Sequence, residues 1–469
     1  MGNPKAFLTI NRKEAGYRPV HDRINDFGEV EQTLNTSDRM KQASRCMDCG
    51  VPFCHWACPL GNKQPEWQHL IYTGKWKEAY QVLESTCDFP EFTGRICPAP
   101  CEKSCVLKLS ANEPVTIREN EVSIAERAFQ EGYIKVHTPV RNGKKVAVIG
   151  SGPAGLTAAN RLNRKGYTVT VFEKNEMAGG LLRYGIPNFK LAKNIVERRI
   201  DLMKEEGVIF KTGVQVDTLP EGFDAYCIAI GAEVPRDLPI EGRKLKGIHF
   251  AMEYLAQQNR LLESVPVAPE TLINAKGKKV LVIGGGDTGS DCVGTANRQK
   301  AVKITQIEIL DKPPVGYNPT TPWPSMYPQV LKTSSSHEEG CERRWNLTSC
   351  RFIGEKGVLK GVEVEEVIWT KGEDGRVQMQ PTGKKEIIEA DLVFLAMGFV
   401  HPVQEGLIKS SNLATDNRKN IIVDKSFKSS ASNVFACGDA TTGASLVVKA
   451  MAAGRDTAKA IDSYLSSII

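Results

Sequence analysis

The stretch Val146–Glu173, which reads VAVIGSGPAGLTAANRLNRKGYTVTVFE, decides the fold of the region around it. It begins with an apolar run typical of a buried strand, and a glycine-rich turn and a helical segment follow. A second strand over Thr168–Phe172 ends the unit. This succession, with G-x-G-x-x-G at the first turn, forms one βαβ unit. The stretch therefore predicts an α/β fold with a parallel sheet.

The glycines of this turn and the acid that ends the unit predict a dinucleotide site. Gly150 permits the tight turn, Gly152 lets the backbone approach a pyrophosphate, and Gly155 lets helix and strand pack closely. The helix N-terminus offers unpaired N–H groups and a partial positive charge to the phosphates. Glu173 lies where a carboxylate can accept hydrogen bonds from a ribose. A glycine turn in an ordinary α/β core is the competing interpretation.

The chain repeats this unit further on. Val280–Gly289 reads VLVIGGGDTG, begins 134 residues after Val146 and matches the first stretch at six of ten positions. A strand over Ile304–Leu310 closes the second unit. Because neither loop carries the lysine of a P-loop, we expect two dinucleotides, FAD on one loop and NADH or NADPH on the other. The contacts predicted in the second unit are Gly284, Gly286, Asp287, Thr288 and Gly289.

Further glycine-containing segments suit a flavin site. In Ala178–Pro187 several glycines stand beside aromatic and aliphatic residues, as expected where backbone lies against a flat ring, although an irregular loop is the alternative. Asn433–Asp439 reads as a strand that ends in Gly-Asp before a helix, so a carboxylate can reach a ribityl hydroxyl and the helix N-terminus can face the flavin. Two further strands, Asp224–Ile230 and Asp391–Met397, also end at a glycine. The cofactor contacts predicted in these four segments are Gly180, Leu181, Arg183, Gly231, Gly398, Gly438 and Asp439.

Cysteines are concentrated before the first βαβ unit, where eight of the thirteen fall within residues 46–105. One group has the pattern C-x2-C-x4-C-x3-C-P and the other C-x3-C-x3-C. Such spacings let several thiolates meet at one centre, and soft sulfur ligands suit iron–sulfur clusters or zinc. Structural zinc would favour two C-x2-C pairs, and only one is present. The pattern therefore favours iron–sulfur clusters over zinc and over a disulfide framework.

The count of ligands leaves one position open. Two four-iron clusters need about eight ligands, and the two groups supply seven: Cys46, Cys49, Cys54, Cys58, Cys97, Cys101 and Cys105. The eighth candidate is either Cys87, which stands outside both groups, or a downstream carboxylate such as Glu121.

Composition excludes some classes of partner. The 469 residues carry a net charge of +6 with no long basic run, so nucleic acid is not an expected partner. No apolar stretch approaches the roughly 20 residues of a transmembrane helix, and the N-terminal residues lack the apolar core of a signal peptide. We expect a cytoplasmic protein without a membrane partner.

The expected architecture is two Rossmann-like dinucleotide-binding domains, one of them discontinuous, preceded by a mainly α-helical iron–sulfur domain. The expected division is 1–144 for the helical domain with two 4Fe-4S clusters, 145–270 and 396–469 for the FAD domain, and 271–395 for the NAD(P)H domain. Helices are expected near Phe27–Ala43 and over Pro65–Glu84, and a long insertion loop over Pro313–Cys350.

Together these motifs resemble the small (β) subunit of bacterial-type glutamate synthase, an iron–sulfur flavoprotein family that oxidises NAD(P)H. The likeness covers essentially the whole chain, including Gly16–Pro19, Phe89–Arg95, both cysteine groups and both glycine loops. Thr321–Pro324 and Ser334–Gly340 are especially specific. They resemble the branch in which the same module is also fused behind the large synthase chain.

The resemblance implies a ligand set for each cluster. One set would be Cys46, Cys49, Cys54 and Cys105, and the other Cys58, Cys97 and Cys101 with Glu121, which matches a non-cysteine ligand in related enzymes. FAD would occupy the first loop and the C-terminal segment, and NAD(P)H the second loop.

The resemblance also implies an activity as the electron-input subunit of glutamate synthase. Hydride would pass from nicotinamide to flavin, and electrons singly through the clusters to an FMN on a separate large (α) subunit. There they would reduce 2-iminoglutarate, formed from 2-oxoglutarate and glutamine-derived ammonia, to L-glutamate. No catalytic acid or base is expected from this chain, because the cofactors carry the chemistry.

One departure from the family pattern concerns the nicotinamide nucleotide. Related members carry an Arg-Arg pair at the end of the second βαβ strand, suited to the 2′-phosphate of NADPH, whereas Ile307–Lys312 here reads IEILDK. Asp311 near a ribose would favour NADH, and Arg298 or Lys312 could still bind a phosphate. NADH and NADPH both remain open.

Two alternatives differ from this function. An NAD(P)H–ferredoxin transhydrogenase or a dihydropyrimidine-dehydrogenase-like subunit would share the module but not the acceptor. A zinc- and nucleotide-binding scaffold without catalysis belongs to another class, and it would give a colourless protein without acid-labile sulfide.

Overall fold

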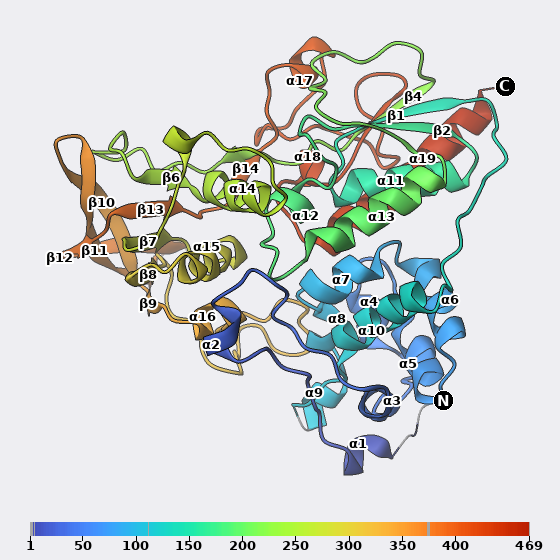
Figure 1. Cartoon of the computed structure of the whole chain (residues 1–469), viewed down its shortest axis with the longest axis horizontal. Helices are drawn as coiled ribbons and strands as arrows, with labels where there is room; N and C mark the ends of the chain where they lie inside the picture. The colour runs from blue at the N-terminus through green and yellow to red at the C-terminus, as the bar shows by residue number, and fades with distance from the viewer. Residues whose placement is uncertain (1–2, 4, 111, 373–375, 469) are drawn as a thin grey trace.

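The computed structural model describes residues 3, 5–110, 112–372 and 376–468. Two five-stranded parallel sheets lie beside a helical part formed by the first 130 residues or so (Figure 1). This confirms the expected class, an α/β fold with two Rossmann-like units preceded by a mainly α-helical region.

The first sheet carries the first glycine loop at its centre. Its order is β15-β4-β1-β2-β3, so the outermost strand comes from near the C-terminus. Helix α11 (Pro153–Arg164) joins β1 to β2, and the long C-terminal helix α19 (Val447–Ser467) packs against α11 (Figure 1). The strands are β1 (Lys145–Ile149), β2 (Thr168–Phe172), β3 (Ile209–Lys211), β4 (Ala225–Ile228) and β15 (Val434–Ala436).

The second sheet repeats this plan in the order β6-β13-β7-β8-β9, with α15 (Asp287–Arg298) joining β7 to β8. Its strands are β6 (Ile248–Phe250), β7 (Lys279–Ile283), β8 (Lys303–Ile307), β9 (Glu342–Arg344) and β13 (Leu392–Leu395). Strand β6, followed by α14 (Ala251–Leu262), belongs to this sheet although it precedes residue 270. We therefore propose that the boundary expected at 270 lies before β6, and the other expected boundaries remain proposals.

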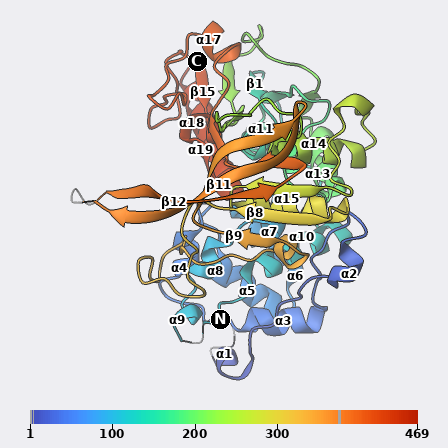
Figure 2. The ribbon, with the colours of Figure 1, turned by 90° about the vertical axis from the view of Figure 1, so that its left-hand side faces the viewer.

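A third, antiparallel sheet lies beside the second. It consists of β10 (Leu347–Glu355), β11 (Val358–Lys371) and β12 (Val377–Glu389), and nearly every residue of β12 is exposed. Figure 2 shows β11 and β12 projecting from the body of the molecule. The expected loop over Pro313–Cys350 is corrected in its second half, which contains α16 (Ser335–Glu338), β9 and the start of β10. A short pair, β5 (Val234–Pro235) with β14 (Phe399–His401), completes the strands.

Short helices make up the N-terminal part and surround a core that includes Trp67, Phe89 and Phe92. These helices are α1 (Ala6–Thr9), α2 (Val20–Arg23), α3 (Thr36–Ser44), α4 (Phe53–Ala57), α5 (Gln64–Tyr72), α6 (Trp76–Thr86), α7 (Pro90–Ile96), α8 (Pro100–Lys103), α9 (Leu107–Ser110) and α10 (Ile117–Gln130). The remaining helices are α12 (Leu181–Tyr184), α13 (Lys193–Glu205), the 3₁₀ turn Pro269–Thr271, α17 (Leu407–Ser410) and α18 (Asp439–Thr442).

Two of the helix predictions are wrong in extent. The helix expected near Phe27–Ala43 begins only at Thr36, because Asn35 caps it by accepting a hydrogen bond from the backbone N–H of Asp38 at 2.9 Å. The helix expected over Pro65–Glu84 is two helices, because Gly74 between them has a left-handed φ of +76°. Within the residues that the structure describes, no helix combines the length and the apolar character needed to cross a membrane.

Candidate functional site

The first glycine loop has the geometry of a phosphate-binding turn. Gly150 has a φ of +101°, and its N–H donates to the Phe172 carbonyl at 2.8 Å. A Cβ at Gly155 would lie 2.0 Å from the Gly150 carbonyl oxygen, whereas a Cβ at Gly152 would meet nothing within 4 Å. Gly152 also begins α11 without a side-chain cap, so N–H groups at the helix start face open space. These features fit a pyrophosphate beside Gly152.

The second loop has the same geometry. Gly284 has a φ of +121°, and its N–H donates to the Ile307 carbonyl at 2.9 Å. A Cβ at Gly289 would lie 2.3 Å from the Gly284 carbonyl oxygen, and one at Gly286 would again meet nothing within 4 Å. Gly286 begins α15 without a side-chain cap. The structure therefore brings Gly284, Gly286 and Gly289 together as it does Gly150, Gly152 and Gly155.

A carboxylate follows the second strand of each unit. Glu173 is buried, and its Oε2 accepts from the Ser151 N–H at 3.2 Å and the Ser151 hydroxyl at 2.5 Å. Glu308, directly after β8, accepts from the Gly285 N–H at 2.6 Å. Sequence reasoning placed the second acid at Asp311, which is exposed three residues beyond. Comparing the two units would have found Glu308, since each acid directly follows its strand.

The segment around Gly180 lies against the first loop. A Cβ at Gly180 would be 2.8 Å from Cα of Gly152. Leu181 next to it is 42% exposed, as expected of a residue that faces a ligand. Arg183 is buried instead: its Nε donates to the Ala178 carbonyl at 2.7 Å, and its guanidinium pairs with two glutamates, Glu197 and Glu263. Arg183 thus holds the segment in shape, and its direct contact with the cofactor stays a prediction.

The C-terminal segment closes the same side of the first sheet. A Cβ at Gly438 would lie 2.8 Å from that of Ala154 in α11, so Gly438 touches the start of the loop helix. Asp439 accepts from the Ser445 hydroxyl at 2.7 Å, and burial raises the pKa of its carboxyl. Gly231 and Gly398 occupy equivalent places after β4 and β13, and a Cβ at either would meet nothing within 4 Å.

Three predicted contacts of the second unit lie in or beyond the first turn of α15. Asp287 and Thr288 begin the helix next to Gly286, and Asp287 forms an ion pair with Lys332 at 2.6 Å. Arg298 ends the same helix, about 16 Å along its axis. Its guanidinium is buried in an ion pair with Glu339 at 2.5 Å. The ion pair gives Arg298 a structural role, and its contact with the nucleotide stays a prediction.

The cysteines line two separate cavities in the helical part. The first is lined by Cys46, Cys49, Cys54 and Cys105, together with apolar neighbours such as Phe53. The second is lined by Cys58, Cys97, Cys101 and Glu121, and also by Val448 of α19. Gln64 lines both cavities and so stands between them. The structure thus gathers the predicted ligands into two sets of four.

Glu121 and Cys87, the two candidates for the eighth ligand, have different positions. Glu121 lines the second cavity, and burial raises the pKa of its carboxyl to about 7. Its oxygens accept from Thr93 and, at 3.1 Å, from Asn62. Cys87 is buried beside Thr93, with 3.3 Å between sulfur and hydroxyl oxygen, and does not line the cavity. The geometry favours Glu121.

Two family models match the chain. The pyridine nucleotide-disulphide oxidoreductase model matches residues 144–454, which contain both sheets. The model described as dihydropyrimidine dehydrogenase domain II, 4Fe-4S cluster, matches residues 23–133, which contain all eight predicted cluster ligands. The chain thus combines an oxidoreductase region of the FAD- and nicotinamide-binding kind with a 4Fe-4S region.

Curated relatives match almost the whole chain. The glutamate synthase [NADPH] small chain of Mycobacterium tuberculosis is 45% identical, over 99% of this chain and 96% of that one. The chain belongs to the glutamate synthase small-chain family. The Bacillus subtilis glutamate synthase [NADPH] small chain is 40% identical over 99% of both chains. Glutamate synthase [NADH] of Schizosaccharomyces pombe is 42% identical over 98% of this chain and 22% of its own length.

Among solved structures, FprA from Mycobacterium tuberculosis in complex with NADPH resembles this chain at a TM-score of 0.54 and 17% identity. The match covers 69% of this chain and 85% of that one, and it shows a shared fold. Membership of the small-chain family and the matched oxidoreductase model identify the chain as an oxidoreductase.

The surroundings of the thiols in this family member fit iron–sulfur ligation. Burial raises the pKa of the Cys46 and Cys97 thiols to about 12, so a positively charged iron centre would be needed to hold them as thiolates. Backbone N–H groups lie within hydrogen-bonding reach of several sulfurs, for example those of Asn62 and Leu60 toward Cys58. Such N–H groups tune the potential of a cluster.

The thiols are not arranged as ligands of one ion. Within the described ranges, no group of three or more His, Cys, Asp or Glu side chains is arranged to hold a single metal ion. In a four-iron cluster each thiolate binds a different iron, so its ligands stand farther apart than those of tetrahedral zinc. The preference for clusters over structural zinc rests on the spacing of the cysteines, which provides only one C-x2-C pair.

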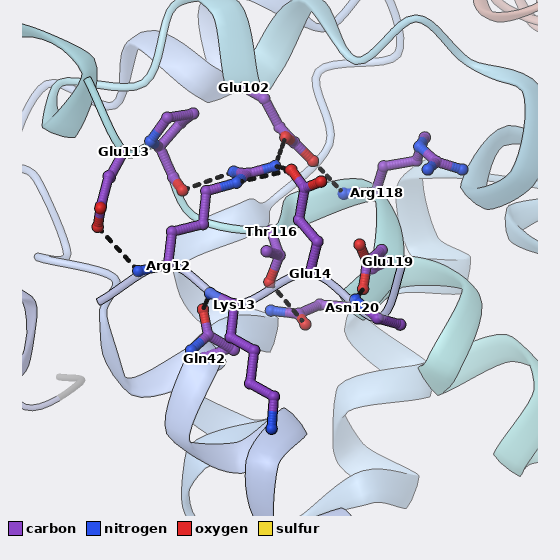
Figure 3. Close-up of polar contacts among 12 residues, drawn as sticks. Arg12, Lys13, Glu14, Gln42, Glu102, Glu113, Thr116, Arg118, Glu119 and Asn120 are labelled. Carbon is purple, nitrogen blue, oxygen red and sulfur yellow. Dashed lines mark hydrogen bonds and ion pairs between the residues drawn. The ribbon is translucent and has the colours of Figure 1, made fainter. Parts of the chain in front are cut away.

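The N-terminal segment around Arg12 fastens segments that carry cluster ligands, a role that the sequence did not indicate. Figure 3 shows Arg12 pointing toward Glu102 of α8, and the ion pair is 2.8 Å long. Arg12 also donates to the Pro114 carbonyl at 2.6 Å. Glu102 also accepts from the Arg118 N–H at 2.9 Å (Figure 3). Because Glu102 directly follows Cys101 and Pro114 precedes α10, the N-terminal segment fastens the segments that carry ligands of both cavities.

Proposed function

We propose that the chain is the electron-input subunit of glutamate synthase. It would oxidise NADH or NADPH at FAD and deliver electrons through two 4Fe-4S clusters to the FMN of a large subunit. There L-glutamate would be formed from glutamine and 2-oxoglutarate. The observation that carries the proposal is the grouping of eight predicted ligands into two cavities in a chain that matches small chains along its whole length.

When bound, FAD supplies the exchange between hydride and single electrons, and iron–sulfur clusters supply single-electron carriers. The residues of the chain bind and position these groups. The loop Gly150–Gly155 and the start of α11 would bind the FAD pyrophosphate, and Asp439 would orient the ribityl chain. The loop Gly284–Gly289 would bind the nicotinamide nucleotide.

The position of the second cavity supports an order for the relay. Val448 in the first turn of α19 lines this cavity, and α19 follows the Gly438-Asp439 segment of the flavin site. Arg455, two turns further on, donates to the carbonyls of Leu60 at 2.9 Å and Thr86 at 3.0 Å in the helical part. The described residues that line the first cavity all fall within 46–117. In the proposed order, electrons pass from the flavin to the cluster of the second cavity and then to the cluster of the first cavity. From the first cavity they leave the protein.

An anaerobic reconstitution tests the proposal. The chain, loaded with iron, sulfide and FAD, is mixed with a glutamate synthase large subunit, glutamine, 2-oxoglutarate and NADH or NADPH, and glutamate is measured. We expect glutamate only when both chains and a nicotinamide nucleotide are present. A large subunit whose FMN site is blocked by substitution is the matched control.

The competing acceptor is ferredoxin, as in the transhydrogenase hypothesis. The model that matches the cysteine region bears the name of dihydropyrimidine dehydrogenase, so such a 4Fe-4S region is not confined to glutamate synthases. In the same assay, rapid reduction of ferredoxin without glutamate formation would replace the proposed function by that one.

A further inference from the structure

A carboxylate beside the second glycine loop, that of Glu308 after β8, has no role assigned by the family resemblance. Glu308 stands where Glu173 stands in the first unit. Each acid directly follows the second strand of its βαβ unit, and each accepts from the N–H of the residue after the first loop glycine, Ser151 in one case and Gly285 in the other. At this place an acid binds the hydroxyls of an adenosine ribose.

The backbone around Glu308 is fixed on three sides. Its N–H donates to the Arg344 carbonyl of β9 at 2.9 Å, and its carbonyl accepts from the Leu347 N–H at 3.2 Å. The next carbonyl, of Ile309, accepts from the indole N–H of Trp369 in β11 at 2.9 Å. The antiparallel sheet thus holds the end of β8 in place. The carboxylate is partly exposed, so a ribose can reach it.

The two residues directly after Glu308 carry no charge. Ile309 and Leu310 belong to the segment 307–312, in which the family resemblance places the Arg-Arg pair of related members, and they are 37% and 54% exposed. Two cations of this region, Lys312 and Arg343, each lie 5.1 Å from the ring centre of Trp345. A phosphate dianion beside the Glu308 carboxylate would be repelled by like charge at the position where the ribose hydroxyls bind.

We propose that Glu308 is a specificity-determining residue that binds the adenosine ribose of NADH and disfavours NADPH. The inference rests on the proposed function, in which the second loop binds the nicotinamide nucleotide. The names of the relatives do not decide the question, since small chains named for NADPH and a synthase named for NADH are about equally similar to this chain.

Binding of adenosine fragments tests the inference without flavin or electron transfer. Isothermal titration calorimetry compares ADP-ribose with 2′-phospho-ADP-ribose on the full chain. We expect wild type to bind ADP-ribose at least about tenfold more tightly. Glu308→Gln keeps an acceptor for the Gly285 N–H but removes the charge, and it should bring the two affinities within about threefold. A double variant, Ile309→Arg with Leu310→Arg, should reverse the preference.

Asp311→Asn, the matched control, removes a charge three residues after Glu308. It should leave the ratio of the affinities for ADP-ribose and 2′-phospho-ADP-ribose as in wild type. The inference is overturned if wild type binds the phosphorylated fragment equally well, or if Asp311→Asn changes the ratio as much as Glu308→Gln does. If neither fragment binds, the nucleotide assignment of the proposed function fails as well. If the fragments behave as expected but no glutamate forms in the reconstitution, only the acceptor is wrong.

Discussion

Two glycines of the first loop, three residues apart, differ in what a methyl group would meet. At Gly155 a Cβ would lie 2.0 Å from a backbone oxygen, so Gly155→Ala should destabilise the fold by about 3 kcal/mol and prevent FAD binding. At Gly152 the space is free in the chain itself, so Gly152→Ala should keep the fold yet weaken FAD at least about tenfold, because the methyl group would occupy the place of the pyrophosphate. Thermal unfolding and flavin absorbance separate the two effects.

The contrast between these variants is the informative result. If Gly152→Ala bound FAD as wild type does, the pyrophosphate would have to lie elsewhere. The corresponding pair in the second unit, Gly289→Ala and Gly286→Ala, should affect the nicotinamide nucleotide and leave the flavin content unchanged.

A partly buried histidine makes stability depend on pH. Burial lowers the pKa of His337 to about 4, and its ring lies between Ser334 and the Gln306 oxygen, 2.8 Å from Nε2. The unfolded chain, with a pKa near 6.5, binds more protons between about pH 4 and 6.5. Stability is therefore fully present above about pH 6.5 and falls as the pH drops toward 4. The shift corresponds to roughly 3 kcal/mol, and because the ring is partly exposed, solvent screening reduces the expected loss to about 2 kcal/mol.

His337→Gln should reduce this loss while leaving stability near pH 7.5 similar to that of wild type. The comparison uses thermal unfolding midpoints of both proteins from pH 7.5 to 5. Charged groups that also act on His337 are present in both proteins and cancel in the difference; they are Lys190, Asp287, Lys332 and Arg343. Parallel pH curves would show that His337 does not contribute.

At the residue scale, sequence reasoning succeeded where a local pattern decides the position. The loop glycines follow from spacing alone, and the structure gives them the expected contacts. Arg183 and Arg298 could not be judged in this way, because their partners Glu263 and Glu339 lie far away in the sequence. An exposed arginine and a buried, paired one look alike in a sequence.

At the scale of elements, helix α19 connects the flavin side of the molecule to the helical part. Arg455→Met keeps most of the side-chain length but removes the hydrogen bonds to the carbonyls of Leu60 and Thr86. We expect a loss of about 1–3 kcal/mol, since charged hydrogen bonds to two carbonyls disappear. Transfer from reduced flavin to the clusters should slow by a few-fold, while flavin reduction by the nucleotide remains unchanged.

Stopped-flow absorbance under anaerobic conditions measures both steps. Lys459→Met, at an exposed position on the same helix, is the control and should change neither. If Arg455→Met slowed flavin reduction as much as the later step, the effect would be a general distortion and not a weakened connection.

The elements themselves were predictable to different degrees. Both βαβ units follow from short-range patterns, and their strands and helices lie close to the expected residues. The helix start at Thr36 and the break at Gly74 depend on a cap and on one left-handed residue, which apolar periodicity does not reveal. The antiparallel sheet after β9 was missed in part because the start of β10 lies in the segment expected as a loop and because β12, which is largely exposed, lacks a continuous apolar face.

At the scale of the whole molecule, the grouping of cysteines depends on topology. Cys105 joins the first cavity although Cys97 and Cys101, its neighbours in sequence, line the second. Spacing alone predicted the number of ligands. The assignment of Cys105 to the cavity of the other cysteine group came from the family resemblance. The reason is geometric: the turn of α8 after Cys101 carries the chain from one cavity to the other.

Substitution of single ligands tests the separation of the two cavities. Cys49→Ser should remove the cluster of the first cavity and Cys97→Ser that of the second, so each variant should keep about four of about eight irons. The two variants should differ in electron paramagnetic resonance, because each retains a different cluster.

Cys87→Ser is the matched control. Cys87 is buried but lies outside the cavity, so the iron content of this variant should equal that of wild type. If Cys87→Ser also lost half of its iron, Cys87 and not Glu121 would be the eighth ligand. If either ligand variant lost all iron while circular dichroism showed an intact fold, the two cavities would form one interdependent centre.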